Sequence, residues 1–247
     1  MTTGILLSCL VVFVTHTLEA VTGFGCTVLA LPFVTALLGI KDGVIALTVI
    51  AWLLAAYFAV TKWKQIDFRQ YFIIAGCMLL GLPVGIYLFR TVNMANLKRM
   101  LAVFICIVSA WQLFRLFTKQ KPEGKLSRLR RSMYYLILVT GGIVHGMFSS
   151  GGPFVVLYSS KMIRDKGSFR ATMCLLWTTL NLIIITGYTV SHSFNAENGK
   201  IIACFIPFLL AGIFTGEKIH NKINTHFFSI LVFSILLLTG ITMLISG

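Results

Sequence analysis

The chain has 247 residues, of which 57% are hydrophobic and 11% charged, and its formal net charge at pH 7 is +14. Its mean hydropathy is +0.91. This composition leaves too little polar surface to cover a soluble domain, so it predicts an integral membrane protein. Nearly all Lys and Arg residues fall between apolar segments rather than in a soluble basic domain, so we expect no nucleic-acid partner.

Eight apolar segments follow one another along the chain, and a membrane-spanning helix needs about 20 apolar residues. They cover residues 4–39, 43–61, 70–89, 100–114, 132–160, 171–191, 201–216 and 225–245. The first segment is too long for one span. The six cysteines are scattered inside these segments without metal-ligand spacing, so we expect neither a metal nor a cofactor. The pattern predicts an all-α, multi-pass protein of the cell (inner or plasma) membrane.

The positions of Lys and Arg test how often each segment crosses the membrane. If all eight segments cross once, these residues divide almost evenly between the two sides. If segment 132–160 enters and leaves on the same face, sixteen fall on one side and five on the other. We therefore predict a re-entrant hairpin in this segment, with the basic loops in the cytoplasm and the C-terminus outside.

Two Gly-rich interruptions lie in mid-run in segments 4–39 and 132–160, where Gly and Pro break a helix. They comprise Thr22, Gly23, Phe24, Gly25, Cys26 and Thr27 in the first and Ser149, Ser150, Gly151, Gly152 and Pro153 in the second. The matched breaks predict two inverted repeats, each a broken or re-entrant helical hairpin followed by three transmembrane helices. Residues 1–118 form the first repeat, 119–131 a basic cytoplasmic linker and 132–247 the second. Both termini then lie outside, although the first segment could instead make two full spans.

Broken helices inside a membrane leave backbone N–H and C=O groups that protein, water or a ligand must satisfy. The half-helices after the two breaks would direct their positive N-terminal ends toward the midplane, and such ends favour an anion. We therefore expect the residues of both breaks to bind a small anionic substrate. The alternative is that their small side chains only allow helices to pack closely in lipid.

The stretches from His16 to Pro32 and from Gly142 to Tyr158 resemble the paired motifs of the TauE/SafE family of sulfite and organosulfonate exporters. The resemblance implies a small secondary transporter that exports a sulfur-containing anion, with the Gly-rich stretches along the substrate path. Cys26, Thr27 and Pro153 stand where further glycines are common in the family, which leaves the particular anion open.

Two other kinds of function compete with a carrier. An anion channel would share the same site chemistry, and a membrane-embedded enzyme or assembly factor belongs to another class. The sequence has no H-E-x-x-H motif, no G-x-S-x-G motif and no pair of intramembrane carboxylates, so we expect no enzyme. The pattern does not predict an oligomeric state; membrane lipid and the anion are the expected partners.

Five single residues outside the breaks are also candidates. Glu19, the only formally charged residue among the first forty, holds the place that His145 holds in the second half. The two either couple transport to protons or only support the breaks by hydrogen bonding. Arg170 either recruits the anion from the cytoplasm or anchors its helix at the interface. Trp177 and Asn181, one helical turn apart, either face the site or pack in the core.

Overall fold

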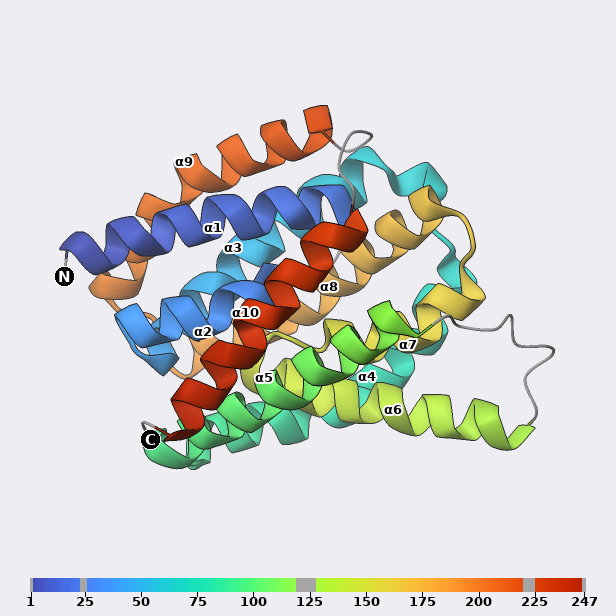
Figure 1. Ribbon diagram of the computed structural model, residues 1–247, viewed down its shortest axis with the longest axis horizontal. Helices are drawn as coiled ribbons and strands as arrows, with labels where there is room; N and C mark the ends of the chain where they lie inside the picture. The colour runs from blue at the N-terminus through green and yellow to red at the C-terminus, as the bar shows by residue number, and fades with distance from the viewer. Residues whose placement is uncertain (1, 23–25, 119–127, 220–224, 246–247) are drawn as a thin grey trace.

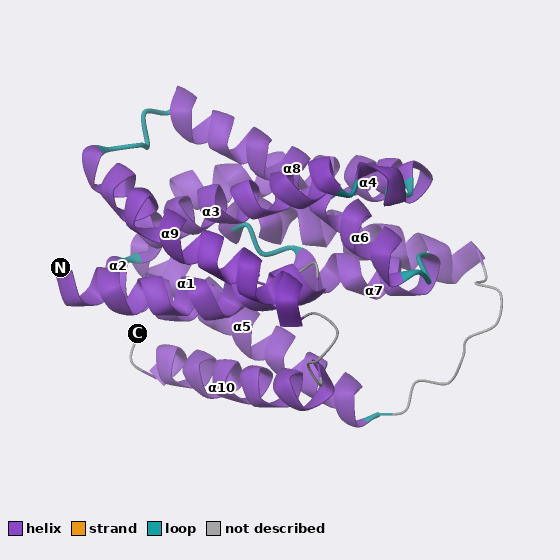
Figure 2. Ribbon diagram, turned by 90° about the horizontal axis from the view of Figure 1, so that it is seen from above, coloured by secondary structure: helices purple, strands orange, loops and turns teal. Residues whose placement is uncertain are grey.

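The computed structural model describes residues 2–22, 26–118, 128–219 and 225–245. Their regular structure is entirely helical, as the composition predicts (Figure 2). The first half holds α1 (Thr2–Thr22), α2 (Cys26–Leu38), α3 (Ile40–Thr61), the short 3-10 helix η1 (Trp63–Gln65), α4 (Phe68–Thr91) and α5 (Met94–Phe117). The second half holds α6 (Arg128–Phe148), α7 (Gly152–Met162), α8 (Lys166–Val190), α9 (Ala196–Ile219) and α10 (Thr225–Ile245).

Six of these helices are long and apolar enough to cross a membrane, namely α1, α3, α4, α5, α8 and α9. Large apolar side chains such as Phe72, Leu80 and Phe114 are exposed on the outer surface of the bundle. Such a surface is unfavourable in water but matches lipid chains. The chain is therefore a multi-pass membrane protein.

A helix ends and another begins at each predicted break, although residues 23–25 of the first break lie outside the described residues. Segment 4–39 divides into α1 and α2, and segment 132–160 divides into α6 and α7, with residues 149–151 between the second pair. Pro153 is the second residue of α7, in the first turn, where its missing N–H removes no helical hydrogen bond. Most of residues 90–99, which lie between the apolar segments 70–89 and 100–114, belong to helices, because only residues 92–93 separate α4 from α5. Polar residues mark where the apolar surface ends, whereas a helix continues into water.

The pairing of the helices has the same pattern in both halves: if α1 to α5 are exchanged in order with α6 to α10, every pair below is matched by another pair or by itself. Helix α4 packs on α6 and α1 packs on α9, while α3 packs on α8 and α5 on α10. In Figure 1 both chain ends lie at the left, whereas α6 and α8 begin at the right. The hairpin of α1 and α2 and the hairpin of α6 and α7 therefore open toward opposite ends of the molecule.

Glycines bring α4 and α6 into close contact. A Cβ atom added at Gly81 or Gly85 would collide with backbone carbonyl oxygens of α6, and one added at Gly142 or Gly146 would collide with carbonyl oxygens of α4. The two spacings of four residues form facing small-xxx-small surfaces, which let backbones approach closely in lipid. This contact fixes the helix that carries His145.

Candidate anion-binding site

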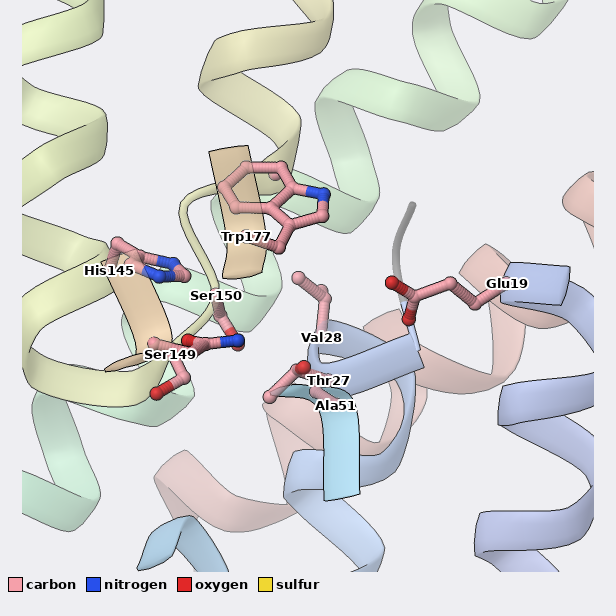
Figure 3. A pocket seen from close by; sticks show the side chains of 10 residues that line it. Glu19, Thr27, Val28, Ala51, His145, Ser149, Ser150 and Trp177 are labelled. Atoms are coloured by element: carbon pink, nitrogen blue, oxygen red, sulfur yellow. The ribbon is translucent and has the colours of Figure 1, made fainter. Parts of the chain in front are cut away.

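A polar pocket lies inside the bundle where the second helix break meets α1, α2, α3 and α8 (Figure 3). It is lined by Glu19, Thr27, Val28, Ala51, His145, Ser149, Ser150, Gly152, Trp177 and Asn181. The cavity volume is about 20 Å³, which is room for about one water molecule. The pocket is therefore too narrow for a ligand much larger than a water molecule.

Eight of the sixteen sequence-predicted site residues come together in this pocket, although they lie on five helices and one break. They are Glu19, Thr27, His145, Ser149, Ser150, Gly152, Trp177 and Asn181. Gly151 and Pro153 serve the start of α7 and are not among the lining residues. Gly23, Phe24 and Gly25 lie outside the described residues, as do the side chains of Thr22 and Cys26.

His145 is the most constrained polar side chain of the pocket. The backbone N–H of Gly151 donates to its Nδ1 atom at 3.3 Å, so the neutral imidazole carries its proton on Nε2. The ring is 1% exposed and stacks obliquely on Trp177 with 5.2 Å between ring centroids. Among the described residues, Nε2 has no hydrogen-bond partner. It is therefore a fixed N–H donor without an acceptor.

Asn181 lies against His145 and interacts electrostatically with the ring, but the two side chains do not meet hydrogen-bond geometry. Its side chain is 2% exposed, and its Oδ1 atom has no hydrogen-bond partner within the part of the chain that is described. A buried polar atom without a partner is costly, so such atoms are uncommon in native proteins. Two of them at one pocket indicate that something polar binds there.

The two serines of the break are held by the protein itself. Ser149 has a φ of 52°, which a residue with a side chain rarely adopts, and its Oγ lies 2.6 Å from Oγ1 of Thr48. The Thr48 hydroxyl donates to the carbonyl of Val44, so Ser149 donates to Thr48. Ser150 donates to the carbonyl of Phe148. Strained backbone of this kind is concentrated at functional sites.

The adjacent glycines of the break have different surroundings. A Cβ at Gly151 would lie 2.5 Å from the carbonyl oxygen of Gly141 and 2.9 Å from Cβ of His145. A Cβ at Gly152 would have Trp177 Cζ2, 4.0 Å away, as its nearest neighbour. Gly151 therefore allows α6 and α7 to approach each other, whereas Gly152 leaves space in the pocket. The N–H of Gly152 belongs to the first turn of α7, where backbone donors lack intrahelical acceptors.

Glu19 and His145 lie on opposite sides of the pocket, with Trp177, Val28 and Thr27 between them (Figure 3). Glu19 is 3% exposed near the end of α1. The two residues that sequence symmetry relates therefore share one pocket but do not form a directly bonded pair. Protonation of His145 on Nδ1 would require its bond from Gly151 to break.

Three residues at or beside the pocket carry no clear signal in the sequence. Val28 and Ala51 are small apolar residues among many, and Thr48 is a hydroxyl in an apolar helix that could simply bond to its own backbone. Only the packing of α2 and α3 around the second break gives them a role. Arg170, in contrast, lies on α8 outside the pocket.

Apolar helices of membrane length around a polar pocket at a broken helix are typical of membrane transporters with discontinuous helices. The comparison with protein families agrees, because the profile described as "Sulfite exporter TauE/SafE" matches residues 8–243. The chain belongs to this family of membrane anion transporters. No curated protein and no solved structure matches it.

Proposed function

We propose that the protein exports a small, singly charged sulfur oxoanion, such as hydrogensulfite or an organosulfonate, as a secondary transporter. The observation that carries this proposal is the pair of buried atoms without partners, Nε2 of His145 and Oδ1 of Asn181, beside the N-terminus of α7. An oxoanion would accept from the imidazole N–H and from the free N–H of the first turn. A protonated oxygen of hydrogensulfite would in turn donate to Asn181.

The charge of the pocket supports a monoanion over a dianion. None of its described lining residues is Lys or Arg. One helix N-terminus contributes the equivalent of about half a positive charge, and a second from α2 would bring the sum to about one. This balances one negative charge, whereas a dianion such as sulfate would keep an uncompensated charge in an apolar setting.

Glu19 supplies the coupling in this proposal. An ionised carboxylate in the same pocket would repel the anion, so substrate binding is favoured when Glu19 is protonated. Proton uptake at Glu19 and anion binding would then accompany each other. His145, fixed as an N–H donor, acts in binding rather than in proton transfer.

Alternating access requires the site to open, since a cavity for about one water molecule cannot hold a four-atom oxoanion. The closed pocket supports a carrier rather than an open anion channel. We infer that the halves are inverted repeats, because hairpins that open toward opposite ends provide the two access routes. By the distribution of Lys and Arg, the end at which α6 begins is cytoplasmic and both chain ends lie outside.

The experiment is flux of radiolabelled sulfite in proteoliposomes that contain the purified chain. Methanesulfonate, which is always a monoanion, should compete with the label and drive counterflow, whereas sulfate at the same concentration should not. Ohmic current without counterflow would assign a channel. Equal competition by sulfate would refute the monoanion argument, and the absence of flux for every anion tested would refute the proposed function.

A further inference from the structure

Among the described residues, another polar side chain with atoms that lack hydrogen-bond partners, that of Arg170, lies between the pocket and the proposed cytoplasmic end. The guanidinium of Arg170 is placed over the ring of Phe58, with 3.8 Å between Cζ and the ring centroid. Its Nε and Nη2 atoms are buried and have no hydrogen-bond partner among the described residues. The side chain as a whole is half-buried, so one side of it remains open.

The position of this pair follows from the antiparallel packing of α3 and α8. On α3, Phe58 lies seven residues beyond the pocket residue Ala51, and on α8, Arg170 lies seven residues before the pocket residue Trp177. Seven residues correspond to about 10 Å along a helix and return to nearly the same face. Arg170 and Phe58 therefore lie about 10 Å from the pocket, at the end where α3 finishes and α8 begins.

An interfacial anchor does not account for this geometry. An anchoring Arg extends its charged head to water or lipid headgroups. Here Nε and Nη2 of Arg170 are buried instead, and the guanidinium lies over the ring of Phe58. A guanidinium stays charged and has five N–H donors, so unbonded buried donors persist where another group pairs with them for part of the time. The cation–π contact with Phe58 holds the side chain in the meantime.

We propose that Arg170 is a first binding station for the exported oxoanion, reached from the cytoplasmic end before the pocket. This inference rests on the proposed function, because it takes the substrate class and the direction of transport from it. The planar fork of Arg matches two oxygens of a sulfite or sulfonate group. One helical turn further on, Cys174 is within electrostatic reach of both Arg170 and Glu19, so the station leads toward the pocket.

Glu217 and Tyr57 also lie within electrostatic reach of Arg170. Glu217, near the end of α9, is exposed, and its charge competes with an arriving anion for the guanidinium. The station is therefore a cation whose nearby carboxylate and aromatic ring hold it only weakly. Removing the competing carboxylate should tighten anion binding, and removing the guanidinium should weaken it.

The test compares R170Q, R170K and E217Q with R164Q, which removes an exposed cation at the same end of the molecule. For sulfite loaded from the cytoplasmic side of proteoliposomes, R170Q should raise the half-saturating concentration about tenfold or more, as expected for lost charge-assisted hydrogen bonds. R170K should restore part of the affinity, E217Q should lower the half-saturating concentration, and R164Q should leave it unchanged. Half-saturation from the other side should change little in all four variants.

Thermal unfolding of the detergent-purified chain separates this role from a structural one. R170Q should unfold at the wild-type temperature or above it without sulfite, because an unpaired buried charge is removed, and should lose part of the stabilisation that sulfite confers. A lower unfolding temperature with unchanged half-saturation would make Arg170 a packing residue and overturn the proposal. If the wild type transports sulfite but R170Q matches it, only the station fails; if the wild type transports neither sulfite nor methanesulfonate, the proposed function fails as well.

Discussion

Replacing Gly152 by Ala should weaken anion binding without harming the fold. The added methyl would have Trp177 Cζ2, at 4.0 Å, as its nearest neighbour, which is ordinary van der Waals contact. Alanine also favours the helix by about 0.5–1 kcal/mol relative to glycine. The methyl would, however, take up a cavity of about 20 Å³ and cover the first-turn N–H. Losing one hydrogen bond to a charged ligand costs about 1.5–3 kcal/mol, so affinity should fall roughly 10- to 100-fold.

Gly151→Ala is the matched control, because it adds the same methyl one residue earlier. There the methyl would lie 2.5 Å from the carbonyl oxygen of Gly141, which overpacks the contact between α6 and α7 by about 1–3 kcal/mol. Sulfite flux in proteoliposomes and thermal unfolding in detergent measure both effects. Gly152→Ala should keep the unfolding temperature and lose flux, while Gly151→Ala should lower the unfolding temperature. Normal sulfite affinity in a folded Gly152→Ala variant would refute the site.

Glu19→Gln should flatten the pH dependence of sulfite transport while the protein stays folded, and a wild-type pH profile would make Glu19 structural. Thr48→Val removes the acceptor that holds the strained serine of the break, so flux should fall and stability should drop by about 1 kcal/mol in thermal unfolding; unchanged flux would show that this bond does not shape the site. Gly85→Leu should force α4 away from α6 and cost about 3 kcal/mol of stability, and a wild-type unfolding temperature would contradict the close helix contact. Single cysteines at positions 125 and 164 should both react from the cytoplasmic side with an impermeant thiol reagent, and opposite sidedness would rule out the hairpin of α6 and α7.

Local patterns predicted the helices and their breaks well because membrane constraints act on short stretches of chain. A run of about 20 apolar residues suffices to indicate a span, and glycine or proline in mid-run interrupts it wherever the helix packs. The break between α6 and α7 lies where Ser149 to Pro153 predict it. Helices α4 and α5 extend beyond the apolar segments 70–89 and 100–114, because polarity reports contact with water rather than the end of a helix.

The candidate site could be predicted in part for the same reason. Intramembrane Glu19 and His145 and the mid-helix Asn181 are costly in lipid, so the sequence marked them as candidates, and the structure brings them to one pocket. Their specific roles could not be read locally. The hydroxyls of Ser149 and Ser150, which the sequence suggested as donors to the anion, donate to Thr48 and to the Phe148 carbonyl instead.

The sequence by itself determined that this protein lies in a lipid bilayer, that it is helical and which family it resembles. Composition, hydrophobic runs and the paired Gly-rich motifs, which carry these conclusions, are properties of the chain alone. Tertiary structure alone decided which donors are left for a ligand, and that Arg170 stacks on Phe58. The physical reason is that a hydrogen-bonding group is available to a ligand only if the neighbouring groups in the folded protein bond to other partners. Which partners are bonded depends on helix contacts between residues more than one hundred positions apart, such as Thr48 with Ser149.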